Sequence, residues 1–290
     1  MRIGVTHGID IDGIVSGILL ERALGNIDVV HTDYPELVNT LQSLPKGEIH
    51  VADLSPTGKR STFVDVVTRL QPYAWYDHHN WEGAENAIPA ITHPYIRAHT
   101  NAASIIQDVY SLHKPHEQQL AHLGYVSDHQ VREDSEYETA TRIQHAITAA
   151  NNGLASLEEI ISHLRTTTHI HGAIHDAERA YHKKHLQATT QLQKTAVQKT
   201  IEGVTYVAGV ADNILYMKEG LRALRAKGDV VITAFPNNAV IAKGDKVDVV
   251  AWARKNQGGG RNDSAGFIQD EPATPEELIE QASAYRKPEI

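Results

Sequence analysis

Histidine and aspartate lie close together near the start of the chain, in a pattern that suits metal binding. His7, Asp10 and Asp12 fall within six residues, between a short apolar run and a helical pattern. Carboxylate oxygens bind hard cations such as Mg²⁺ and Mn²⁺, imidazole nitrogen binds softer ones, and a loop lets three side chains converge on one point. The alternative is a structural role, because Asp12 is well placed to cap the following helix.

Further acidic positions repeat this arrangement along the chain. Asp53 ends a third apolar run, Asp77, His78 and His79 end a fourth, and Asp128 follows a later one. Two adjacent histidines are costly to bury without partners, so one of them should turn toward a metal or a phosphate. The carboxyl ends of parallel strands open into one crevice, which would bring these side chains together. Four apolar runs are each followed by an acid and two of them also by a histidine, and six such nitrogen and oxygen ligands are enough for two metal ions.

The sequence contains no cysteine but has 18 histidines. Disulfides, thiolate nucleophiles and cysteine-ligated zinc or iron–sulfur clusters are therefore excluded, and any metal must be held by nitrogen and oxygen. The histidines between residues 163 and 185 are expected to lie on solvated helical faces rather than in a metal site.

Short apolar runs alternate with helical patterns up to about residue 130, which is typical of a parallel sheet with helices on its faces. The expected strands are residues 2–6, 27–31, 49–52 and 72–76. The expected helices are 13–24, 100–112 and 117–123, and 124–128 is interpreted as a strand end or a helix-to-loop junction. We therefore predict an α/β fold with flanking helices.

At roughly 150 residues per domain, a chain of 290 residues corresponds to about two domains. Residues 1–150 form the predicted parallel-sheet domain, and residues 151–200, rich in Ala, Gln, Thr, Lys and His, form a predicted helical linker. Strand and helix patterns then start again, so residues 201–290 are predicted to form a second, smaller α/β domain.

Charge and hydropathy exclude several classes of protein. The net charge of −9 would repel a long phosphate backbone, so no long nucleic acid is expected as a partner. No apolar run reaches the length of about 18 residues that a membrane span needs. His7, Asp10 and Asp12 also interrupt the segment where a signal peptide would have its apolar core. We expect a cytoplasmic protein without a membrane partner.

The motifs and their order resemble those of the DHH phosphoesterase superfamily, which is named for a tripeptide like the one at residues 77–79. The N-terminal part of the resemblance rests on THGIDIDGIVS at 6–16, Asp53, DHH at 77–79 and Asp128. The C-terminal part rests on VDVVA at 247–251, GGGR at 258–261 and AGF at 265–267, which is similar to the DHH-associated domain with its glycine-rich motif. The motifs of both domains cover most of the chain.

The resemblance implies two divalent cations, Mn²⁺ in first place and Mg²⁺ as the alternative, in a catalytic domain at 1–150. It also implies a substrate-binding domain at 201–290. Carried over to this sequence, the first ion has the ligands His7 and Asp10, the second has Asp12, His78 and Asp128, and Asp53 bridges the two.

The resemblance also implies which residues meet the substrate. Asp77 would support the adjacent histidine, and His79 would face the scissile phosphate. The backbone amides of Gly258, Gly259 and Gly260 would bind a nucleotide phosphate. Arg261 stands where the family usually has histidine, and its guanidinium can bind a phosphate bidentately.

Within this family, a compact and acidic chain favours a phosphodiesterase that hydrolyses short oligonucleotides or dinucleotides to mononucleotides. The alternatives are a RecJ-like exonuclease on longer single strands, a 3′-phosphoadenosine phosphate phosphatase, and a non-catalytic nucleotide-binding protein. The exonuclease would need a basic channel lined by aromatic residues, and the chain has only three Trp and three Phe. A homodimer is a possible assembly.

Overall fold

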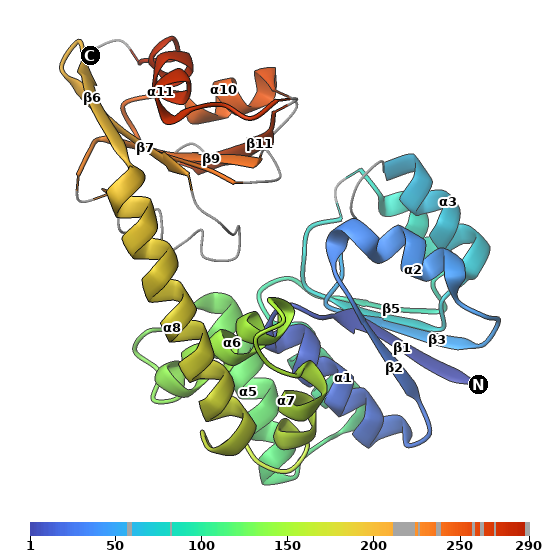
Figure 1. Cartoon of the computed structure of the whole chain (residues 1–290). Coiled ribbons are helices and arrows are strands. Elements are labelled where there is room, and N and C mark those ends of the chain that lie inside the picture. The colour runs from blue at the N-terminus through green and yellow to red at the C-terminus, as the bar shows by residue number, and fades with distance from the viewer. Residues whose placement is uncertain are drawn as a thin grey trace. The chain divides into compact units, whose positions relative to one another are not determined.

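The computed structural model describes residues 1–56, 60–81, 83–210, 224–225, 227–235, 239–256, 259–261, 264–269 and 271–287. The chain divides into two compact units, Met1–Tyr181 and His182–Ile290. Their boundary lies within the long helix α8 (Gly172–Thr195), which Figure 1 draws in yellow. Among the helices described, none is long and apolar enough to cross a membrane.

The first unit is built on a parallel sheet of five strands in the order β2-β1-β3-β4-β5. Because all strands point the same way, their carboxyl ends lie along one edge. The strand order reverses between β1 and β3, and such switch points are where open α/β sheets bind ligands. The predicted parallel-sheet α/β class is confirmed. The strands are β1 (Arg2–His7), β2 (Asp28–Thr32), β3 (Glu48–Ala52), β4 (Ala74–Asp77) and β5 (His93–Ile96).

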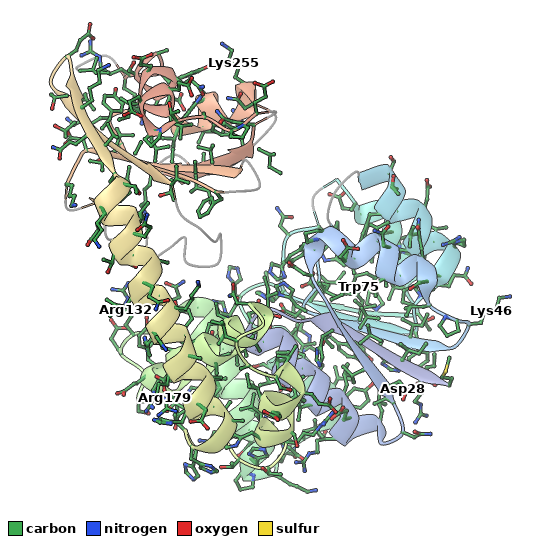
Figure 2. All side chains as sticks on the ribbon, in the orientation of Figure 1. Asp28, Lys46, Trp75, Arg132, Arg179 and Lys255 are labelled. Atoms are coloured by element: carbon green, nitrogen blue, oxygen red, sulfur yellow. The ribbon has the colours of Figure 1, made fainter. Side chains whose placement is uncertain are left out.

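Helices cover both faces of this sheet (Figure 1). On one face, α2 (Leu37–Ser43) and α3 (Arg60–Leu70) enclose a hydrophobic core. Trp75, labelled in Figure 2, is fully buried in this core. On the other face lie α1 (Ile11–Leu24) and α4 (Ala102–Tyr110). Short 3₁₀ helices at Tyr34–Glu36 and Glu85–Ala90 complete the connections.

The segment 124–128 lies inside helix α5 (Pro115–His129), so its interpretation as a strand end or a helix-to-loop junction is wrong. The expected helix ended at residue 123, but Gly124 continues it and is needed there for close packing. A Cβ atom on Gly124 would lie 2.7 Å from Asn101 Nδ2 and 2.9 Å from Asp12 Oδ1. The glycine therefore lets α5 approach α1 and α4 closely.

The segment between residue 151 and Tyr181 packs with the first unit. Helix α7 (Leu157–Leu164) contacts α1 and α6 (Tyr137–Asn151). The first half of α8 is fixed to α6 by two hydrogen bonds of 2.9 and 2.8 Å from the Arg142 guanidinium to the Glu178 carboxylate. The linker predicted at 151–200 thus contributes its first part to the compact sheet unit.

The second unit has a mixed sheet of six strands in the order β10-β11-β9-β8-β7-β6. Helices α10 (Val249–Lys255) and α11 (Pro275–Ser283) pack on it through a core that includes Trp252 and Leu278. The predicted second α/β domain is confirmed in its fold class. The strands are β6 (Val197–Ile201), β7 (Val204–Val210), β8 (Val230–Ala234), β9 (Ala239–Lys243), β10 (Gly259–Arg261) and β11 (Ser264–Ile268).

Candidate metal centre

His7 and Asp10 meet in the loop between β1 and α1. His7 ends β1 and is only 4% exposed. Asp10 is the N-cap of α1, where its Oδ1 accepts a hydrogen bond of 3.0 Å from the Gly13 amide. Its other oxygen, Oδ2, lies 2.7 Å from His7 Nδ1. A Cβ atom on Gly13 would lie 2.1 Å from the His7 carbonyl oxygen, so glycine is required for this tight loop.

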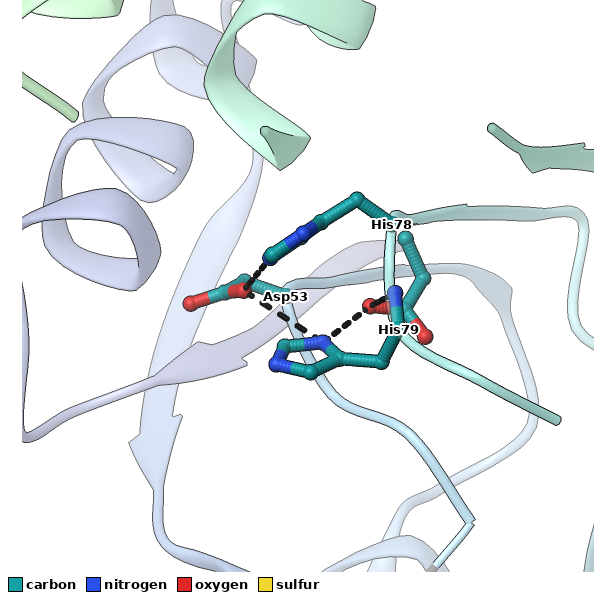
Figure 3. A group of neighbouring side chains, drawn as sticks. Asp53, His78 and His79 are labelled. Carbon is teal, nitrogen blue, oxygen red and sulfur yellow. Dashed lines mark hydrogen bonds and ion pairs between the residues drawn. The ribbon is translucent and has the colours of Figure 1, made fainter. Parts of the chain in front are cut away.

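Asp53 follows β3 and lies between two groups of side chains. Its backbone has a φ of 58°, a left-handed conformation that Asp adopts more readily than most residues, and the residue is 2% exposed. Oδ2 lies 3.5 Å from His7 Nδ1. Oδ1 lies 3.3 Å from His78 Nε2 and 3.9 Å from His79 Nδ1, as Figure 3 shows.

Asp77 is fully buried, and both of its carboxylate oxygens have fixed partners. Oδ1 lies 2.7 Å from His79 Nδ1, and Oδ2 accepts a hydrogen bond of 2.7 Å from the Trp81 indole. The histidine that Asp77 supports is therefore His79 rather than the adjacent His78. This contact directs the other ring nitrogen of His79 toward the Tyr34 hydroxyl, 3.5 Å away.

Asp12 approaches the cluster while it caps a helix other than the expected one. Its carboxylate accepts hydrogen bonds of 2.8 and 3.0 Å from the amides of Ala102 and Ala103, and of 2.6 Å from the Asn101 side chain. Asp12 thus caps α4, whereas the cap of α1 is Asp10, so the capping role considered for Asp12 on the following helix is wrong. One Asp12 oxygen lies 3.9 Å from His78 Nε2.

Asp128 stands in the last turn of α5, not at the end of a strand. The sequence could not separate these cases because Tyr125 and Val126 suit either element. Asp128 Oδ2 nevertheless lies 3.5 Å from His78 Nε2. A helix therefore supplies the acid that an apolar strand was expected to supply.

The structure brings the predicted ligands together in overlapping groups. One group consists of His7, Asp10 and Asp53, and the other consists of Asp53, Asp77, His78 and His79; within each group the ligand atoms lie within 4.8 Å of one another. Asp53 belongs to both groups, and Asp12 and Asp128 each lie close to His78. The assignment of each residue to a particular ion stays a prediction.

The buried carboxylates of this cluster repel one another, and burial and this repulsion together shift their pKa values. Burial, together with the negative charges of Asp10 and Asp12, raises the pKa of Asp53 well above its usual range. Burial also raises the pKa of Asp12 to about 6, although the Ala103 amide acts in the opposite direction. Burial by itself lowers the pKa of His7, but its contacts with Asp10 and Asp53 outweigh this effect and raise it to about 10. Buried carboxylates so close together are stabilised by a positive charge between them.

Unsatisfied atoms point to the same conclusion. Within the described part of the chain, His7 Nδ1, Asp53 Oδ2 and His78 Nε2 are buried, and the contacts of 2.7 to 3.5 Å described above leave each of these atoms without a partner in hydrogen-bond geometry. Buried polar atoms in proteins nearly always have such partners. Imidazole nitrogens and carboxylate oxygens are also the donor set that Mn²⁺ and related cations accept. The residues present therefore fit a divalent-cation centre.

The sequence matches no protein-family model and no curated protein. Solved structures do match over nearly the whole chain. A pGpG-specific phosphodiesterase from Vibrio cholerae is 16% identical with a TM-score of 0.57, and the match covers 98% of this chain and 100% of that chain. The DHH domain of a protein from a family of ribosomal proteins is 12% identical with a TM-score of 0.66, covering 98% of this chain and 86% of that chain. This chain has the DHH fold.

A third neighbour agrees with this assignment of the fold. An exopolyphosphatase-related protein from Bacteroides fragilis is 12% identical with a TM-score of 0.52, and the match covers 98% of this chain and 90% of that chain. The acid and histidine cluster stands at the carboxyl ends of β1, β3 and β4 of the DHH fold, with Asp128 added from α5.

Two residues of the site escaped the sequence analysis although a signal for one was present. Asp33 follows β2 as Asp53 follows β3, and its Oδ1 lies 3.4 Å from His7 Nε2. Tyr34 comes next, with its ring centroid 4.9 Å from that of His7. Burial raises the pKa of Tyr34, so its hydroxyl stays protonated. The rule that found the other acids would have found Asp33 as well.

Helix α6 also contributes to the site, and no local sequence pattern predicted this contribution. The Gln144 side chain donates to the Ile9 carbonyl at 2.8 Å and accepts from the Ile11 amide at 3.2 Å. Asn151 donates to the Gly8 carbonyl at 3.0 Å. These amides fix the backbone between His7 and Asp10 from far along the sequence.

Part of the predicted glycine motif lies in the sheet of the second unit. Gly258 lies outside the described residues. Gly259, Gly260 and Arg261 form the edge strand β10, which pairs antiparallel with β11. Their role in substrate binding stays a prediction.

Proposed function

We propose that this chain is a two-metal-dependent phosphoesterase that hydrolyses the phosphodiester bonds of short oligonucleotides or dinucleotides to mononucleotides. The observation that carries the proposal is the position of Asp53, whose two oxygens lie 3.5 Å from His7 Nδ1 and 3.3 Å from His78 Nε2. A carboxylate between two ligand groups is the arrangement that a pair of ions requires. The names of the neighbours, a phosphodiesterase and an exopolyphosphatase-related protein, support phosphate esters or anhydrides as substrates.

The ligands divide between the two ions around Asp53. His7 and Asp10 would hold one ion, Asp12, His78 and Asp128 would hold the other, and Asp53 would bridge them. Mixed imidazole and carboxylate ligands favour Mn²⁺ over Mg²⁺, which prefers oxygen alone. When bound by these residues, the two ions would supply a nucleophile at neutral pH and would neutralise charge on the phosphate.

His79 is positioned to act on the substrate from the chain itself. Because Asp77 accepts a hydrogen bond from His79 Nδ1 at 2.7 Å, the imidazole is held with Nε2 pointing away from the carboxylate. Nε2 can then hold a proton for a phosphate oxygen, and the Tyr34 hydroxyl beside it can donate a further hydrogen bond. Preorganised donors of this kind stabilise charge that develops on the transferring phosphoryl group.

The second unit would bind the rest of the substrate. We assign the amides of Gly258, Gly259 and Gly260 and the Arg261 guanidinium to a phosphate contact, as backbone nests and arginine commonly provide. A short substrate is favoured because the net charge of −9 opposes a long phosphate backbone.

Hydrolysis by metal-stripped protein, with Mn²⁺ or Mg²⁺ restored, tests this function. The substrates are dinucleotides, five-residue RNA, long single strands, cyclic dinucleotides, 3′-phosphoadenosine phosphate and pyrophosphate. We expect metal-dependent turnover that is fastest on the shortest RNA. Preference for long single strands would indicate an exonuclease instead. Preference for 3′-phosphoadenosine phosphate would indicate a phosphatase, and binding without turnover would indicate a nucleotide-binding protein.

Substitution of two proposed ligands, the bridging Asp53 and His78 of one ion, tests the site. Asp53→Ala and His78→Ala should abolish metal-dependent turnover. Asp134→Ala is the matched control, because Asp134 also pairs with a histidine, His122 at 3.1 Å, but on the surface outside the cluster. Normal activity in either Asp53→Ala or His78→Ala would overturn the metal assignment.

A further inference from the structure

Two aromatic side chains of helix α5 form an exposed pair beside the metal centre. Tyr125 and His129 are one helical turn apart, a spacing that places both on the same face. Their ring centroids are 4.4 Å apart with the planes tilted by 50°. Tyr125 is 37% exposed, so part of its surface is available to a ligand.

The pair is joined directly to the proposed ligands. His129 Nε2 lies 3.9 Å from Asp128 Oδ2, and the His129 ring centroid lies 6.4 Å from that of His78. A hydrogen bond of 3.1 Å to the Thr100 carbonyl fixes the orientation of the His129 imidazole. A phosphate bound at the cluster would therefore place the neighbouring part of its ester close to this pair.

The chemistry of the pair suits a nucleobase better than another phosphate. Tyrosine and histidine rings are the side chains on which unpaired bases stack, and such stacking tolerates any base. Neither ring offers a fixed positive charge to a second phosphate group. Inorganic polyphosphate would gain nothing from this surface.

We propose that Tyr125, held against His129, is a specificity-determining residue that stacks on a nucleobase next to the scissile phosphate. The proposal rests on the phosphoesterase function above and narrows its substrate class to nucleobase-bearing esters. Because stacking on the base is the same before and during reaction, it lowers KM and leaves kcat unchanged.

Steady-state kinetics on matched substrates test this role. One substrate is a dinucleotide, and the others are the same diester with one base removed, in each of the two positions. We expect Tyr125→Ala to raise KM for the dinucleotide roughly tenfold with kcat retained. The variant should leave KM unchanged for one of the two base-free diesters, and Tyr125→Phe should behave as the native chain.

Tyr73→Ala is the matched control. Tyr73 is 41% exposed and also contacts a histidine ring, that of His93 at 4.8 Å, but it precedes β4 at the end of the sheet away from the cluster. It should not change KM for any substrate. An equal loss on all substrates in Tyr125→Ala, or no loss on the dinucleotide, would overturn the stacking role.

A binding measurement separates this proposal from the proposed function. Calorimetry with AMP and with ribose 5-phosphate, each added to the Mn²⁺-loaded chain, should show tighter binding of AMP, and Tyr125→Ala should reduce that advantage roughly tenfold. If the native chain hydrolyses no dinucleotide, the proposed function fails while this comparison still decides whether the pair binds a base. Equal affinity for AMP and ribose 5-phosphate in the native chain would contradict the stacking role.

Discussion

Asp53 is the residue of the candidate centre that contacts both groups of ligands. Its backbone is left-handed, and its burial together with the nearby charges of Asp10 and Asp12 raises its pKa. Each of these features costs free energy in a protein without a cation. A pair of divalent ions, as proposed, would reverse the electrostatic part of this cost, because the repelling carboxylates would become ligands.

His31 on β2 contributes one component of the pH dependence of the stability of the first unit. Burial lowers its pKa to about 4, Glu21 opposes this effect, and Arg165 adds to it. Its Nδ1 lies 2.8 Å from the Thr6 hydroxyl. In the unfolded chain His31 binds a proton near its ordinary value of 6.5, whereas the folded chain does not until about pH 4. The stabilisation is therefore complete above pH 6.5 and is lost as the pH falls toward 4.

We expect His31→Gln to flatten this pH dependence. Glutamine can still hydrogen-bond the Thr6 hydroxyl but does not titrate, so a pH-dependent loss on the order of 3 kcal/mol should disappear. Urea unfolding between pH 4.5 and 7.5 in the presence of chelator measures the effect, with the exposed His175→Gln as control. An unchanged slope in His31→Gln would show that this histidine is not held neutral.

At the scale of elements, α6 acts as a clamp on the loop between β1 and α1. Gln144→Leu would leave the Ile9 carbonyl and the Ile11 amide without their partner on α6. Residues that orient metal ligands typically contribute about 10- to 100-fold to metal affinity. We predict a loss of that size for Mn²⁺ binding, measured by calorimetric titration.

The matched control for the clamp is Gln107→Leu in α4. Gln107 also donates to a backbone carbonyl, that of Leu112 at 3.2 Å, but in a turn away from the cluster. Gln107→Leu should leave Mn²⁺ affinity unchanged. Equal affinity in both variants and the native chain would mean that α6 does not position the loop.

The same elements show how far sequence reasoning reaches. Apolar runs followed by acids located β1, β3 and β4 and the side chains at their ends, because strand periodicity and parallel topology are local and general rules. The same pattern of an apolar run followed by an acid also occurs at Asp33, which the sequence analysis missed. At Asp128 the pattern indicated the end of a strand, but the residue lies in a helix. The role of Gly124 inside α5 was not predicted, because a sequence does not reveal the neighbouring residues that leave no room for a Cβ atom.

Contacts between distant elements were beyond such rules. Gln144 and Asn151 are polar residues on a helix of ordinary composition. Nothing in the neighbouring sequence indicates that they hydrogen-bond to the loop backbone rather than to solvent. The capping of α4 by Asp12 likewise joins segments about 90 residues apart. These interactions depend on tertiary packing, which no single sequence periodicity encodes.

At the scale of the whole molecule, the two units have separate hydrophobic cores and should respond differently to metal. Trp75 and Trp81 belong to the core of the first unit, and Trp252 belongs to that of the second. The chain has no other tryptophan. Trp81 also donates to Asp77 in the candidate centre, so tryptophan fluorescence can report on each unit in turn.

We predict that Mn²⁺ stabilises the first unit alone. In Trp252→Phe, fluorescence should show a thermal midpoint that rises by roughly 5–10 °C when Mn²⁺ is added at about 100 times its Kd. A variant with Trp75→Phe and Trp81→Phe should report an unshifted midpoint for the second unit. Equal shifts in both variants would contradict stabilisation of the first unit alone.

The number of Mn²⁺ ions bound by the full chain decides whether Asp53 lies between two metal ions. We would titrate Mn²⁺ into the metal-stripped native chain and into Asp53→Asn, which tolerates the left-handed backbone but lacks the bridging charge. We predict two Mn²⁺ ions per native chain and loss of the second ion in Asp53→Asn. A single ion in the native chain, or two ions bound equally well by Asp53→Asn, would contradict this prediction.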